Sequence, residues 1–147
     1  MSIIISLVII GSTFFFMEFV AWSVHKFIMH GFLWNLHKDH HVVDHNKFFQ
    51  KNDYFFLIFA IPSIILIFIG FENLTIGFFI GLGIALYGLA YFIIHEIIIH
   101  RRLPPPKKTK SKYIKAIRKA HKIHHKNQGK HNGVNFGMLI VPSKYFK

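Results

Sequence analysis

The chain has 147 residues and a net charge of +12, and 52% of its residues are hydrophobic, including 18 phenylalanines. Its length fits one domain, and the complete lack of cysteine excludes disulfides and thiolate metal sites. The apolar residues are too numerous and too unevenly distributed for a small soluble core. We therefore expect a single membrane-embedded domain over residues 1–147.

Three long apolar segments lie at residues 3–24, 54–71 and 74–94, and Glu18 is the one charged residue within them. An α-helix rises about 1.5 Å per residue, so segments of about 18–22 residues cover roughly 27–33 Å, the hydrocarbon thickness of a bilayer. The sequence therefore predicts an all-α integral membrane protein with about three hydrophobic spans. The first span lacks a basic leader and a small-residue cleavage site, so we expect an anchor rather than a signal peptide.

The basic residues predict the orientation of these spans. All 18 lysines and arginines lie in residues 26–51 and 101–147. By the positive-inside rule, these two regions face the cytoplasm and the N-terminus faces outward. Three crossings agree with this arrangement, and they place a histidine-rich helical cap on the cytoplasmic face.

Residues 101–147 contain 14 basic residues and no acidic one. A nucleic-acid-binding tail is one interpretation, but a basic segment just inside a membrane is more simply held by anionic lipid headgroups. Such a segment also steers an acidic protein partner towards a nearby site. We expect a membrane contact and no nucleic acid.

Several connections can be placed from residue type. We expect a bend at Gly31, a helix start near Asp53, and the end of the third helical run at the prolines of 103–106, because proline lacks a backbone N–H. Glycines permit close approach of a neighbouring membrane helix. In the third span they are Gly77, Gly81, Gly83 and Gly88.

The segment KKTKSKYIKAIRKAHKIHHK, at residues 107–126, has the pattern of an interfacial amphipathic helix. Ile114, Ile117 and three histidines recur at helical spacing, while most of the lysines fall off that stripe. The apolar stripe therefore continues as a stripe of histidines. The shorter apolar segment at 136–141, FGMLIV, is too short to span a bilayer.

Histidines recur in one order, once in each half of the chain. Each half has a pair with four residues between its members, followed by a group with the spacing H-x-x-H-H. The ten histidines are His25, His30, His37, His40, His41, His95, His100, His121, His124 and His125. His45 and His131 lie outside the repeat, and we do not expect them to be ligands.

Neutral imidazole is a good ligand for iron, zinc, copper and nickel. Ten imidazoles are too many for one ion and suit two, so we predict a dinuclear metal site. Positions three and four apart share a helix face, so each H-x-x-H-H group is expected to converge. Histidines five apart either straddle a site or require a local helix distortion, such as an inserted turn. A solvated interfacial histidine or a metal-binding tract is the alternative, but tracts are consecutive rather than spaced and repeated.

Two carboxylates lie near these histidines. HEIIIH at residues 95–100 resembles a zinc-protease signature, but its histidines are five apart, so Glu96 is not expected to act as a hydrolytic base. Glu96 lies four residues before His100, and we expect it to orient one of the histidine ligands. Glu18 is an intramembrane carboxylate, and it is either a partner of a histidine or metal, or an interfacial residue. Tyr87 and Tyr91 either line a substrate path or, as we slightly favour, pack as interfacial aromatics.

The chain resembles the membrane fatty acid hydroxylase superfamily, and most closely the bacterial non-haem beta-carotene hydroxylases. The resemblance is carried by MEFVAWSVHKFIMHGFLWNLHKDHH, NDYFFLIFAIPSI, LYGLAYFIIHEIIIHRR, KAHKIHHK and NFGMLIVP. It implies one such domain in a bacterial inner membrane, two iron ions held by the ten histidines, and O2 as co-substrate. It also implies hydroxylation of beta-ionone rings at C3, from beta-carotene through cryptoxanthin to zeaxanthin, with electrons from ferredoxin and its reductase. The family usually has Asp where this chain has Glu96.

Two other functions remain open from the residues alone. A sterol or fatty-acid hydroxylase or desaturase of the same superfamily would carry the same histidines. A membrane metal-binding or transport protein is a candidate of another class, although transporters bind near the bilayer midplane. The residues also leave open the metal (zinc accepts imidazoles as iron does), the preferred carotenoid, the division of histidines between two ions, and the oligomeric state.

Overall fold

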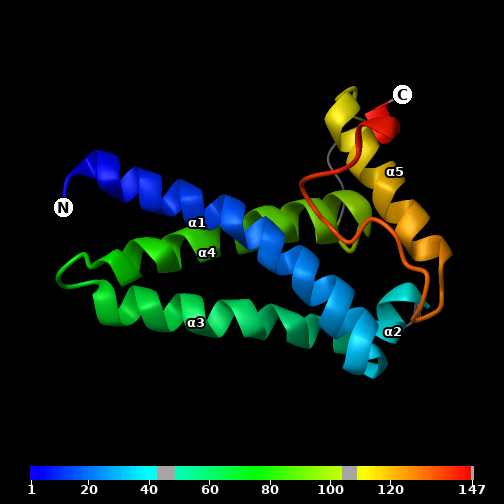
Figure 1. The fold of residues 1–147 in the computed structure, drawn as a ribbon, viewed down its shortest axis with the longest axis horizontal. Coiled ribbons are helices and arrows are strands. Elements are labelled where there is room, and N and C mark those ends of the chain that lie inside the picture. Colours follow the sequence, from blue (N-terminus) through cyan, green and yellow to red (C-terminus); the bar gives the residue numbers. More distant parts are fainter. Residues whose placement is uncertain (43–48, 104–108, 147) are drawn as a thin grey trace.

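The computed structural model describes residues 1–42, 49–103 and 109–146, and every regular element within these ranges is helical. Three long helical runs lie side by side, and the shorter helices α2 and α5 gather at the end away from the N-terminus (Figure 1). The elements are α1 Ile3–Ser23, η1 Val24–Phe32, α2 Trp34–His41, η2 Lys51–Asp53, α3 Tyr54–Gly70, α4 Ile76–Tyr91, η3 Phe92–Ile99, α5 Lys112–Lys126 and η4 Ser143–Phe146. The predicted all-α fold is confirmed.

Three helical runs are long and apolar enough to cross a membrane: Ile3–Phe32, Lys51–Gly70 and Ile76–Ile99. Their outer faces carry large apolar side chains with little cover, such as Phe68 at 82% exposure and Phe15 at 72%. Such a surface is unfavourable in water but matches the hydrocarbon of a bilayer. The three predicted spans are confirmed.

Small residues bring the spans together, as the glycine content of the third span predicts. A Cβ added at Gly81 would lie 2.8 Å from Ile67, and one at Gly83 would lie 2.6 Å from Thr13. The Ser63 hydroxyl also donates a 2.8 Å hydrogen bond to the Gly81 carbonyl. Helix α4 therefore packs closely on α3 and on α1. Gly88 is different, because nothing lies within 4 Å of a Cβ added there.

Two of the spans change from α- to π-helix where their histidine pairs lie. The Leu33 N–H donates to the Ile28 carbonyl and the His100 N–H to the His95 carbonyl, each across five residues. A π turn bonds residues five apart, so it returns such residues to one face. This is the helix distortion that the five-residue spacing predicts. The expected bend is also present, because Gly31 has φ −101° and ψ −124° within η1.

Helix α5 has the predicted amphipathic character. Ala116, Ile117 and Ala120 are buried, whereas Lys115 and Lys119 are exposed. The predicted helix start near Asp53 and the predicted end of the third helical run can also be compared with the structure. Asp53 ends the short helix that leads into α3. The third run ends at Ile99, before the proline segment, and residues 104–108 lie outside the described ranges.

We expect Gly83→Ala to destabilise the protein, because its methyl group would meet the Thr13 side chain and the Ile10 carbonyl within 3 Å. Gly88→Ala is the matched control. It has open space, and alanine favours a helix over glycine by about 0.8–1 kcal/mol. Thermal unfolding in detergent should show a lower midpoint for Gly83→Ala and an equal or higher one for Gly88→Ala. Equal midpoints for Gly83→Ala and the wild type would contradict the close packing.

Candidate metal centre

The ten repeated histidines come together at the end of the bundle where α2, η1, η3 and α5 meet. Nine of them form two groups, and within each group one potential ligand atom from every histidine lies within 4.8 Å of the others. The first group is His25, His30, His37, His41 and His124, and the second is His40, His95, His100 and His121.

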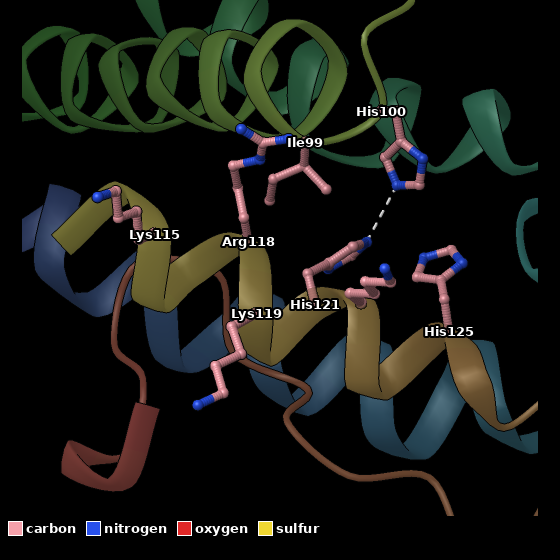
Figure 2. A pocket seen from close by; sticks show the side chains of 8 residues that line it. Ile99, His100, Lys115, Arg118, Lys119, His121 and His125 are labelled. Atoms are coloured by element: carbon pink, nitrogen blue, oxygen red, sulfur yellow. Dashed lines mark hydrogen bonds between the residues drawn. The ribbon is translucent and has the colours of Figure 1, made fainter. Parts of the chain in front are cut away.

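His125 lies beside the second group. Its ring centroid is 4.5 Å from that of His121 and 4.9 Å from that of His100. Its Nε2 atom is buried and has no hydrogen-bond partner within residues 1–42, 49–103 and 109–146. Figure 2 shows His125 next to His100 and His121, whose Nε2 atoms are 3.0 Å apart.

The expectation that each H-x-x-H-H group converges on one point is wrong. On α2, His37 and His41 belong to the first group, while His40 belongs to the second. On α5, His124 belongs to the first group, while His121 belongs to the second. The reason is geometric, because positions i+3 and i+4 lie on opposite sides of position i, about 100° apart.

The two halves of the chain therefore exchange one histidine each. The first half gives its π-helical pair and the i and i+4 positions of its H-x-x-H-H group to one site, and the second half gives its pair and the i position to the other. The i+3 histidine belongs to the group formed mainly by the opposite half: His40 lies in the second group and His124 in the first. His125 occupies the position in this repeat that His41 occupies in the first half, and so it would complete the second group.

Seven of the ten rings have Nδ1 next to an oxygen acceptor, at 2.5–3.1 Å. Carbonyl and carboxylate oxygens only accept, so Nδ1 carries the hydrogen and Nε2 carries a lone pair. The acceptors are the carbonyls of Phe136, Lys130, Asn127 and Val134 for His25, His30, His41 and His124, and side chains of Asn52, Gln50 and Glu96 for His37, His40 and His95.

The Nε2 atoms of these rings then face one another. His25 and His41 each place Nε2 within 3.1–3.2 Å of His37 Nε2, and His40 Nε2 lies 3.1 Å from His95 Nε2. Two lone pairs at this distance repel unless a cation lies between them. Ligand nitrogens about 2.1 Å from one ion and at right angles are about 3.0 Å apart. The donor set therefore fits a metal ion in each group.

Burial keeps these imidazoles neutral. Loss of hydration lowers the pKa of His37 and His124 to about 3, and that of His41 and His100 to about 4. It lowers the pKa of His125 to about 2, and the neighbouring His100 adds to the effect. Because a metal binds the neutral form, these side chains are ready to bind at neutral pH.

Arg102 organises the second group from outside. Its guanidinium donates to Gln50 Oε1 at 2.7 Å and pairs with Glu96 Oε2 at 2.8 Å and with Asp53 at 2.9 Å. The other oxygen of Glu96 lies 2.5 Å from His95 Nδ1. Glu96 thus contacts the candidate ligand His95, its neighbour in the chain.

Glu18 contacts no histidine among its described hydrogen bonds. Its Oε1 accepts from the backbone N–H groups of Met138, Leu139 and Ile140 at 2.8–3.0 Å. Its Oε2 accepts from the Tyr87 hydroxyl at 2.7 Å. Glu18 is 5% exposed and Tyr87 is 3% exposed, so the surrounding protein encloses both side chains.

Several other residues complete the environment. Tyr91 stacks on His95, with 4.7 Å between ring centroids. His131 is exposed and belongs to neither of the two groups found among the described residues. His45 lies outside the described residues. Sequence reasoning missed Gln50, Asn52 and Arg102, because isolated polar residues in a connection carry no periodic signal.

A basic pocket opens beside the second group. It has a volume of about 530 Å³ and is lined by His100, His121 and His125 together with Ile99, Lys115, Arg118, Lys119 and Lys122 (Figure 2). His100 and His125 are partly exposed here, whereas His40, His95 and His121 are buried. The pocket is thus a place where histidines of the second group reach the surface among positive charges.

Residues 10–144 match the sequence model of the fatty acid hydroxylase family. The chain belongs to this family. Among its curated relatives, the beta-carotene hydroxylase of Paracoccus sp. strain PC1 is 37% identical over 91% of this chain and 83% of its own. That of Pantoea ananas is 38% identical over 86% of this chain and 71% of its own. The chloroplastic beta-carotene 3-hydroxylase 2 of Arabidopsis thaliana is 36% identical over 87% of this chain and 43% of its own. No solved structure matches the chain.

The metal-free protein should lose stability in mild acid. The folded-state pKa values of about 2–4 lie below the ordinary 6.5, so the unfolded chain binds more protons below pH 6.5. Each such histidine then lowers the free energy of unfolding by up to about 1.4 kcal/mol per pH unit. Thermal unfolding of metal-free protein in detergent should show a lower midpoint at pH 5.5 than at pH 7.5. Midpoints at pH 7.5 and 8.5 should agree, and an unchanged midpoint at pH 5.5 would contradict the buried neutral histidines.

Proposed function

We propose that this member of the fatty acid hydroxylase family is a carotenoid ring hydroxylase, acting as one domain over residues 1–147. Its reaction would convert beta-carotene to beta-cryptoxanthin and then to zeaxanthin, by hydroxylation at C3 of each beta-ionone ring. The observation that carries the proposal is a pair of all-imidazole groups at one end of three apolar helices, in a chain similar to beta-carotene hydroxylases.

The ten repeated histidines would hold two iron ions, one in each group, with His125 in the second. The irons, when bound and reduced, would supply the activation of O2, which organic side chains do not provide. Zinc also binds imidazole, but it has no redox chemistry. The protein itself fixes the ring orientations through their Nδ1 hydrogen bonds and excludes water by burial.

The substrate would enter from the bilayer. The outer faces of the spans are apolar, and the histidine groups lie where η1 and η3 leave the spans. A long apolar carotenoid aligned with the helices would place one ring at this end. By the distribution of lysine and arginine, we place this end on the cytoplasmic side of a bacterial inner membrane, with the N-terminus outside.

The reaction needs an external reductant. A C–H bond and O2, with two electrons and two protons, give a C–OH group and one water. We propose a ferredoxin, supplied by its reductase, as the electron donor. Acidic electron carriers are attracted by basic surfaces, and the basic pocket also exposes His100 and His125 of the second group.

Expression in bacteria engineered to make beta-carotene tests the reaction. Chromatography of extracted pigments should show cryptoxanthin and zeaxanthin with the wild type. His40→Ala and His124→Ala should remove the products while the protein stays in the membrane, because each deletes a ligand that crosses between the halves. His131→Ala, outside both groups, should retain full activity.

Full activity in both ligand variants would refute the assigned ligands. Unchanged beta-carotene with well-expressed wild type, iron and a competent ferredoxin would refute the carotenoid substrate. Keto-carotenoids, sterols and fatty acids would then be tested in the same cells. Metal accumulation without turnover of any lipid would instead identify a metal-binding or transport protein.

Charge reversal tests the donor surface. Lys119→Glu in the basic pocket should raise the KM for reduced ferredoxin about 10-fold at low salt, with little change in kcat, because charges mainly steer association. Lys26→Glu, an exposed lysine on η1, is the matched control and should change this KM less than 2-fold. Assays at low and high salt should show the Lys119 effect shrinking as salt screens it. Equal KM values for the two variants would refute docking at this pocket.

A further inference from the structure

One stretch of backbone supplies most of the outer support of the first histidine group. The carbonyls of Asn127, Lys130, Val134 and Phe136 accept from Nδ1 of His41, His30, His124 and His25, at 2.7–3.1 Å. We call residues 127–140 the C-terminal strap. Four of the five rings in this group are thus oriented by the strap, and the fifth, His37, is oriented by Asn52.

Glu18 fixes this strap to the first span. Three consecutive N–H groups, at residues 138–140, point at one of its carboxylate oxygens. The strap closes tightly over the carboxylate, because a Cβ added at Gly137 would lie 3.1 Å from Glu18 Oε1. One oxygen that accepts hydrogen bonds from three successive backbone N–H groups fixes the position of that backbone, so this is a firm anchor. Tyr87 holds the second oxygen, which ties the anchor to α4 as well.

The second group has a different kind of support. Nδ1 of His40 and of His95 is held by the side chains of Gln50 and Glu96, and Arg102 bonds to both of these. None of the described hydrogen bonds of these two rings goes to the strap. The two candidate metal sites therefore depend on two separate anchors.

We propose that Glu18 is a positioning residue specific to the first metal site, acting through the C-terminal strap. The proposal rests on the proposed two-metal function, because it assigns Glu18 to one of the two sites. Without the carboxylate, three backbone N–H groups lose their acceptor and the strap loses its position. The rings of His25, His30 and His124 then lose the fixed direction of their Nε2 atoms.

Metal binding tests this without any assay of turnover. Protein purified in detergent would be titrated anaerobically with ferrous iron against a competing chelator. The wild type should bind two ions. In Glu18→Ala one of the two should bind roughly 10–100-fold more weakly, the usual effect of losing outer support of a ligand. Glu72→Ala, a carboxylate exposed in the loop between α3 and α4, is the matched control and should bind both ions as the wild type does.

Double variants identify the affected site. His40→Ala removes a ligand of the second group and His124→Ala one of the first. At an iron concentration where each single variant holds about one ion, Glu18→Ala with His40→Ala should hold almost none. Glu18→Ala with His124→Ala should still hold about one. Arg102→Ala should weaken the second site instead. Combined with His124→Ala it should leave almost no bound ion, and combined with His40→Ala it should leave about one.

The outcomes separate the two proposals. Fewer than two ions in the wild type would refute the two-metal function itself. If the wild type binds two ions and Glu18→Ala binds them equally well, only the role of Glu18 is refuted. The same conclusion would follow if Glu18→Ala weakened the ion of the second site instead of the first. Circular dichroism would check that the variants keep their helices. If Glu18→Ala does not fold, Glu18→Gln, which keeps one acceptor for the strap but no charge, should show a smaller weakening of the same ion, and unchanged binding would refute the proposal.

Discussion

Opposed imidazole lone pairs are the constraint on which the rest of this structure depends. Rings whose Nδ1 atoms donate to fixed oxygens have no hydrogen left on Nε2, and yet their Nε2 atoms lie 3.1–3.2 Å apart in several pairs. Protonation would relieve the repulsion, but burial disfavours the charged form. A cation shared by the rings would remove the repulsion between the lone pairs while the imidazoles stay neutral. The surrounding fold holds the rings in this otherwise unfavourable arrangement.

Each level of the fold contributes to that arrangement. Glycines and a buried serine bring the spans into contact, so that α4 packs on both α3 and α1. The π turns place histidines five apart on a common side. Helix α5 then adds its own histidines from a buried face. The strap and Arg102 fix the rings from outside, through backbone carbonyls in one group and through side chains in the other.

The spans, the π distortion, the bend at Gly31 and the set of histidines that meet could all be predicted from the sequence, because each depends on a local pattern of spacing or hydrophobicity. The division of the histidines could not. Whether His40 joins His37 or His95 depends on how α2 lies against the other helices, which its own spacing does not encode. The partners of Glu18 were also beyond prediction, because they are backbone N–H groups about 120 residues away. Every residue except proline has a backbone N–H group, so the type of residue does not show which of them donates such a bond.

The exchange of His40 and His124 has a consequence for assembly. Each site takes one imidazole from the opposite half of the chain, so neither half can form a complete site by itself. An ion bound in either group links segments up to 99 residues apart, from His25 to His124. Metal binding would therefore crosslink the two halves of the chain, and it would require that both halves have folded and packed together. The membrane domain and its cofactor would become complete in one cooperative event, rather than as two sites filled independently.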